Sequence, residues 1–108
     1  MLETSLWVTT GADVEFRLRV VNAGDTPVEL TFRDACRADF AVLEDGVEIW
    51  RYSDGRAFEQ STYAAELMPG ESAAFEETWP DSQRGDFTAE GTLRAIEAEL
   101  VARTPFSV

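Results

Sequence analysis

The sequence predicts an all-β protein, an immunoglobulin-like two-sheet antiparallel β-sandwich with about seven to eight strands. Apolar and polar side chains alternate along several short segments, and turn residues separate these segments. The 108 residues are 44% hydrophobic, which is enough to fill one core, so we expect a single domain over residues 1–108. Cys36 is the lone cysteine, so the core forms without an intrachain disulfide.

The first predicted strand shows the clearest alternation in the chain. Its apolar residues are Val14, Phe16, Leu18 and Val20, and its intervening residues are Glu15, Arg17 and Arg19. A period of two is typical of a strand with one dry face and one wet face. Turn residues at 22–25 and Pro27 then lead into a second alternating segment, residues 28–32, and residues 33–38 predict a polar connection.

The Asp45-Gly46 pair is the strongest hairpin signal, because glycine tolerates the positive φ that such turns need. Phe40 and Val42 open the strand before it, and residues 47–52 form the strand after it. Bulky side chains occupy both faces of this second strand, so we expect it to be central in a sheet or covered by a neighbouring loop. Residues 53–55 end it.

The segment that follows leaves two alternatives open. Its composition permits a short helix at 62–67, whereas the firm turn at 68–71 suits two adjoining strands. Further on, Phe75 and Trp79 are spaced to share one face of a strand.

The last third of the chain predicts two more strands. Residues 85–93 place Phe87, Ala89, Gly91 and Leu93 on a common face. Residues 94–102 have a helix-like composition, but we favour a turn at 96–98 and a strand from Glu99 onward. The stretch around Pro105 is expected at a sheet edge, where a missing N–H does least harm.

The charge balance excludes several partners. There are 21 acidic residues against nine basic ones, all arginine, for a net charge of −12. Nucleic acid and anionic membrane surfaces need a basic face, so neither is expected as a partner. Abundant carboxylates with arginine in place of lysine are typical of proteins adapted to high salt, and the alternative is an ordinary acidic protein.

The N-terminal residues 1–10 lack the basic and apolar regions of a signal peptide. Apolar runs long enough to span a bilayer, about 20 residues, are also missing. We therefore expect a soluble protein located in the cytoplasm.

Catalysis and cofactor binding are not expected. The chain has no histidine, which excludes Ser-His-Asp triads and histidine zinc sites. The adjacent acids Glu76 and Glu77 would face opposite sides of a strand and would not share a site.

Two sets of residues have both a functional and a structural interpretation. Cys36 lies between Arg33 and Arg37, which would favour a reactive thiolate, but an inert loop cysteine is the alternative. The aromatic residues Trp50, Tyr52 and Phe58 are either contact residues for a partner or core residues.

The central part of the sequence combines several motifs in a fixed order. These are Asp39-Phe40, the Asp45-Gly46 hairpin, Trp50-Arg51-Tyr52-Ser53, Phe58-Glu59-Gln60, Leu67-Met68-Pro69-Gly70-Glu71 and Gly85-Asp86-Phe87. From about residue 14 to 93 the chain resembles the intracellular proteinase inhibitor family, also called BsuPI-type. The resemblance implies an immunoglobulin-like sandwich that inhibits an intracellular serine protease of subtilisin type.

The resemblance also directs attention to one loop. Residues 50–53 would anchor the sheet, and residues 54–60 would lie at its edge. If a loop enters a protease cleft as an extended strand, apolar side chains are candidates for insertion. The candidate protein-binding residues are Trp50, Tyr52, Phe58, Tyr63, Leu67 and Met68. The alternative function is a non-catalytic interaction or structural module with another target.

Overall fold

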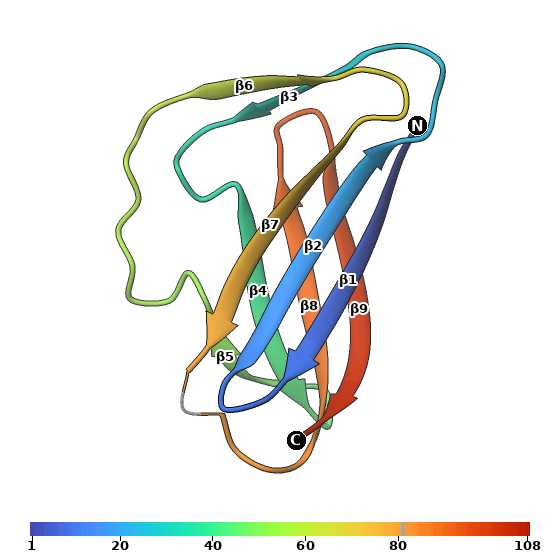
Figure 1. Ribbon diagram of the computed structural model, residues 1–108. Coiled ribbons are helices and arrows are strands. Elements are labelled where there is room, and N and C mark those ends of the chain that lie inside the picture. The colour runs from blue at the N-terminus through green and yellow to red at the C-terminus, as the bar shows by residue number, and fades with distance from the viewer. Residues whose placement is uncertain (81) are drawn as a thin grey trace.

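The computed structural model describes residues 1–80 and 82–108 (Figure 1). Within these residues the chain forms nine strands and no helix. The strands are β1 (Leu2–Thr10), β2 (Val14–Asn22), β3 (Val28–Phe32), β4 (Ala38–Glu44), β5 (Val47–Arg51), β6 (Tyr63–Leu67), β7 (Ser72–Trp79), β8 (Asp86–Arg94) and β9 (Glu99–Ser107). The all-β prediction is confirmed, with nine strands in the described residues in place of seven to eight.

Two antiparallel layers make up the body of the molecule. One sheet has the order β1-β2-β7, and Figure 1 shows it lying in front of the sheet with the order β5-β4-β8-β9. Every strand pair in both sheets is antiparallel. Alternating apolar side chains on each sheet can therefore meet between the layers.

The third sheet, a ribbon of β3 and β6, was not predicted. It lies at the upper left of Figure 1, beyond the body of the sandwich. Phe32 forms an isolated bridge with Ala95, and the Ile96 N–H donates to the carbonyl of Thr31 at 2.8 Å. The ribbon therefore pairs with the turn between β8 and β9 and does not extend either layer.

The core lies between the two layers, as the alternation in β2 predicted. The β2 residues Val14, Phe16, Leu18 and Val20 are all buried. Phe16 stacks on Phe40 of β4 with a centroid distance of 5.8 Å. Phe32 and Trp79 are also interior residues, at most 5% exposed. The predicted shared face of Phe87, Ala89, Gly91 and Leu93 is buried as well.

Strand β1 accounts for the additional strand. Its inward-facing residues are only partly apolar, since Leu2, Leu6 and Val8 share that face with threonines. Trp7 on the outer face is 52% exposed, which obscures the alternation. The pairing with the next strand, β2, runs from Leu2 opposite Asn22 to Thr10 opposite Val14, so the hydrogen-bonded ladder with its neighbour in the chain stabilises a strand with a weak side-chain pattern.

Two ambiguous segments are resolved by the structure. Residues 63–67 form strand β6, not the short helix that composition permitted. The favoured turn before Glu99 is confirmed, and Pro105 lies in the edge strand β9. Glu97 fixes this turn, because its carboxylate accepts from the N–H and the hydroxyl of Thr31 at 2.7 and 2.6 Å. These hydrogen bonds lower the pKa of Glu97.

Strand β5 lies at the edge of its sheet, so of the two predicted alternatives, a central strand or a strand covered by a loop, the first is wrong. The hairpin before it is confirmed, with φ values of 50° at Asp45 and 81° at Gly46. Ile49 is exposed, whereas Trp50 faces the core at 6.0 Å from Phe16 and 6.3 Å from Trp79. The two faces of β5 thus have different surroundings, although both carry bulky side chains.

Candidate functional site

The connection between β5 and β6, residues 52–62, is the longest between consecutive strands. We call it the β5–β6 loop. Figure 1 shows it at the left, passing from the lower end of the sandwich to the β3–β6 ribbon. Most of its side chains are exposed, including the continuous stretch from Asp54 to Ala57. Exposed irregular backbone of this kind is where β-sandwiches usually carry recognition.

A buried carboxylate holds the start of this loop. Asp39, near the start of β4, is 7% exposed. One of its oxygens, Oδ1, accepts from the N–H groups of Phe40 and Ser53 at 2.9 and 3.1 Å. The other, Oδ2, accepts from Arg51 Nη1 at 3.0 Å and from Ser53 Oγ at 2.6 Å. We call these three residues, Asp39, Arg51 and Ser53, the Asp39 bracket.

Arg51 connects the bracket to the exposed face of the sheet. Its guanidinium donates to Glu48 through Nε and Nη2 as well as to Asp39. The hydrogen bonds to Glu48, and then those to Asp39, raise the pKa of Arg51. The arginine therefore stays charged and balances the buried carboxylate.

Side-chain stacking shapes the next part of the loop. The Arg56 guanidinium lies 4.4 Å from the centroid of the Tyr52 ring, and its Nε donates to the Tyr52 carbonyl at 2.9 Å. Phe58 packs against Tyr52 with a centroid distance of 6.0 Å. Further along, the Ala35 N–H donates to the Glu59 carbonyl at 3.0 Å. The loop is thus exposed but attached to the sandwich at several points.

A hollow of about 260 Å³ lies beside this loop. Aromatic residues from four strands or their ends line it, among them Phe40, Tyr52, Tyr63 and Phe75. Burial, followed by a hydrogen bond to Glu77, raises the pKa of Tyr52. The Arg37 guanidinium covers the Tyr63 ring at 4.7 Å from its centroid. The hollow is therefore lined by both aromatic and charged side chains.

Cys36 also lines this hollow, but its thiol is buried. Its Sγ donates to the Ala38 carbonyl at 3.4 Å. Burial raises the pKa of Cys36, and this effect exceeds the opposite effect of Arg94. A buried and protonated thiol is unreactive, so Cys36 fits the interpretation as an inert cysteine and not as a reactive thiolate.

The candidate protein-binding residues fall into three environments. Tyr52, Phe58 and Tyr63 lie at the β5–β6 loop or at its end. Trp50 packs into the core against Phe16 and Trp79. Leu67 is buried at the end of β6, and its neighbour Met68, in the turn before β7, is 46% exposed. The structure therefore brings together three of the six candidates, and the contact role of all six stays a prediction.

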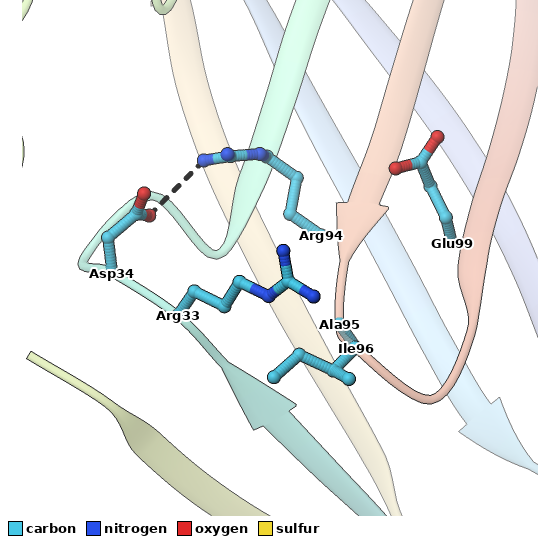
Figure 2. Close-up of a pocket in the computed structure, with 6 residues that line it drawn as sticks. All are labelled: Arg33, Asp34, Arg94, Ala95, Ile96 and Glu99. Carbon is cyan, nitrogen blue, oxygen red and sulfur yellow. Dashed lines mark hydrogen bonds and ion pairs between the residues drawn. The ribbon is translucent and has the colours of Figure 1, made fainter.

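A second hollow, of about 240 Å³, lies between the end of β3 and the turn after β8 (Figure 2). Arg33, Asp34, Arg94, Ala95, Ile96 and Glu99 line it. Asp34 binds the Arg94 guanidinium at 3.2 Å. Two guanidinium groups and two carboxylates give this hollow no net formal charge.

The bracket residues were not among the candidate binding residues. Asp39 is the member that the sequence signals most clearly, because an acidic residue directly precedes the apolar run Phe40-Ala41-Val42 of a buried strand. A buried acid normally has several partners. Those partners, Arg51 and Ser53, lie on the next strand and beyond it, so pairing must be known before they can be assigned.

Residues 1–80 and 82–108 contain neither a metal-binding cluster of side chains nor a membrane-spanning helix. In this part of the chain, no three cysteine, aspartate or glutamate side chains are grouped so that they could hold a metal ion. The same part contains no helix with the length and apolar character needed to cross a membrane.

These features define a class, a small β-sandwich that presents one anchored and exposed loop. The family model described as BsuPI, intracellular proteinase inhibitor, matches residues 2–98. The chain therefore belongs to the BsuPI family of intracellular proteinase inhibitors, as the sequence motifs indicated, and the match extends beyond the motifs at both ends. The family description implies a protein partner, a proteinase. A search of curated proteins gave no significant match.

Proposed function

We propose that this protein inhibits an intracellular serine protease of subtilisin type, and that the β5–β6 loop occupies the protease cleft. One observation supports the proposal: the exposed loop is hydrogen-bonded to the sandwich in both its first and its second half. The Asp39 bracket holds its start, and the Ala35–Glu59 hydrogen bond holds its later half. A loop that is already ordered loses little conformational entropy on binding, which favours affinity.

The contact residues follow from this arrangement. The exposed turn at residues 53–56 would lie at the entrance of the cleft, and the irregular segment after it, beginning with Ala57, would run along the cleft in an extended conformation. Phe58 follows as the apolar side chain, with Tyr52 and Tyr63 supporting it from the side. Binding requires no cofactor and no catalysis by this chain, and it would take place in the cytoplasm.

The charge of the protein affects the conditions under which inhibition occurs. A net charge of −12 repels an acidic protease at low ionic strength. At about 1 M salt the screening length is roughly 3 Å, and this repulsion is largely removed. The abundance of carboxylates supports adaptation to such conditions.

The test is inhibition of a purified subtilisin-type protease by the whole chain in about 1 M NaCl, where repulsion is screened. We expect the native protein to inhibit at micromolar concentration or below. Phe58→Ala should raise the inhibition constant by about tenfold or more, as for a central interface residue. Val101→Ala is the matched control, an exposed apolar residue of β9 outside the loop and outside the candidate binding residues, and should change it less than about twofold.

Two other results would contradict the proposal or place the contact surface elsewhere. Unchanged protease activity at micromolar protein would contradict the proposal and favour a non-catalytic interaction module. If Met68→Ala weakens inhibition and Phe58→Ala does not, the contact surface is the turn between β6 and β7.

A further inference from the structure

We infer that Asp39 is a positioning residue for the β5–β6 loop, which it holds in the conformation that fits the protease, without contacting the protease itself. This inference rests on the proposed function. It concerns a buried side chain of β4, whereas the proposed contacts lie on the loop.

Four donors surround the carboxylate of Asp39. Asp39 accepts from the N–H of Phe40 on its own strand, and from the N–H of Ser53, the hydroxyl of Ser53 and Arg51 Nη1 across the hairpin. A carboxylate has about four acceptor positions, so its capacity is filled. With both oxygens occupied and the residue buried, the side chain has one available orientation.

Ser53 lies just beyond the end of the β4–β5 strand pair. The ladder between β4 and β5 pairs Ala41 with Arg51, and the Tyr52 N–H then donates to the Phe40 carbonyl at 2.8 Å. Ser53 is the next residue, and its N–H donates to the side chain of Asp39 instead of a backbone carbonyl. Asp39 thus continues the pairing for one residue beyond the ladder and sets the direction in which the loop leaves the sheet.

The turn that follows contains Ser53 as a hydrogen-bond acceptor. The Arg56 N–H donates to the Ser53 carbonyl at 3.2 Å, and the Asp54 N–H donates to the Arg51 carbonyl at 3.2 Å. The exposed stretch from Asp54 to Ala57 therefore inherits its orientation from the bracket. Loss of the bracket should release this stretch while the sandwich core remains intact.

The test compares the native protein with Asp39→Asn, which keeps the side-chain shape and replaces one acceptor oxygen by a donor. Ser53→Ala removes only the hydroxyl and serves as a second variant in case Asp39→Asn does not fold. Ser61→Ala is the matched control, because Ser61 is in the same loop but its hydroxyl donates to Glu59 and not to Asp39.

The first measurement is amide hydrogen exchange in the full chain, without a protease. In Asp39→Asn we expect exchange at the hydrogen-bonded amides of Ser53, Asp54 and Arg56 to accelerate by about tenfold or more, and the core amides of β2 and β8 to accelerate by a clearly smaller factor. Ser53→Ala should give a smaller acceleration at the same residues, and Ser61→Ala none. Unchanged exchange at these loop amides would overturn the inference. Equal acceleration in loop and core would also overturn it, because Asp39 would then stabilise the fold as a whole.

The second measurement is inhibition of the same protease. Asp39→Asn should raise the inhibition constant by about tenfold, because the loop must be ordered on binding. If Asp39→Asn shows accelerated exchange in the loop but has the same inhibition constant as the native protein, the positioning role is overturned. If the native protein itself does not inhibit while Asp39→Asn still releases residues 53–57, the proposed function fails and the control of loop conformation by Asp39 is supported.

Discussion

At the scale of single residues, buried polar side chains fix the ends of strands in this protein. Asn22 at the end of β2 is fully buried. Its amide donates to the carbonyls of Thr26 and Leu67 at 2.8 and 2.9 Å and accepts from the N–H of Gly24 at 3.0 Å. One side chain thereby joins β2, the turn after it and the end of β6, which explains how the β3–β6 ribbon stays attached to the front sheet.

Asn22→Ala should destabilise the protein, because the Leu67 carbonyl would lose a buried donor and the part-buried hydrogen bond to the Thr26 carbonyl would also be lost. An unsatisfied buried polar group costs about 1–3 kcal/mol, so we expect the free energy of unfolding to fall by about 2–3 kcal/mol. Urea unfolding followed by tryptophan fluorescence measures this loss. Gln60→Ala, an exposed amide in the β5–β6 loop, is the control and should change stability by less than about 0.5 kcal/mol. Equal midpoints for Asn22→Ala and the native protein would contradict the prediction.

At the scale of elements, the hairpin between β4 and β5 depends on its turn conformation. Asp45 and Gly46 both have positive φ, 50° and 81°, as a two-residue hairpin turn requires. A Cβ at position 46 would meet no atom within 4 Å, so a substitution there tests backbone conformation alone. The hairpin sets the register of β5, and the Asp39 bracket lies at the other end of the same strand pair.

Gly46→Ala should therefore lower stability by about 1–2 kcal/mol, the cost of a left-handed conformation for a residue with a Cβ. Gly11→Ala is the matched control, because a Cβ there would have one ordinary contact, 3.8 Å from the Asp13 carbonyl, and no positive φ. This control should be neutral or slightly stabilising. Thermal unfolding of both variants measures the difference, and equal losses of stability would show that turn conformation is not the cause.

The elements that could be predicted from the sequence are those whose pattern is local. Strand β2 was predictable because its alternation of apolar and polar residues is uninterrupted. The hairpin was predictable because an Asp-Gly pair between two strands strongly favours a two-residue turn. Strand β1 was not predictable, because only part of its inward face is apolar, and the β3–β6 ribbon was not, because it pairs segments far apart in the chain. The loop at the candidate site was identified from family motifs, whereas the Asp39 bracket joins residues from separate strands and requires the pairing to be known.

At the scale of the whole molecule, the surface contains both attractive and repulsive charge pairs. Arg103 binds Glu90 at 2.9 Å across β8 and β9, and Arg17 lies 3.7 Å from Glu76 across β2 and β7. Against these, Glu29 is directly opposite Glu66 in the β3–β6 ribbon, and both are exposed. Exposed ion pairs contribute about 0–1 kcal/mol each, so they do not offset a net charge of −12. Repulsion is the larger long-range effect.

Salt should therefore stabilise this protein. Raising NaCl from about 0.01 to 1 M shortens the screening length from roughly 30 to 3 Å, which weakens repulsion among the excess carboxylates. We expect the urea midpoint to rise over this range, and to rise equally in KCl, because screening depends on ionic strength and not on the cation. Glu66→Gln removes the opposed pair in the ribbon, so its midpoint should exceed that of the native protein at low salt and converge with it at high salt. A midpoint that falls with salt, or a difference that persists at 1 M, would show that repulsion does not limit stability.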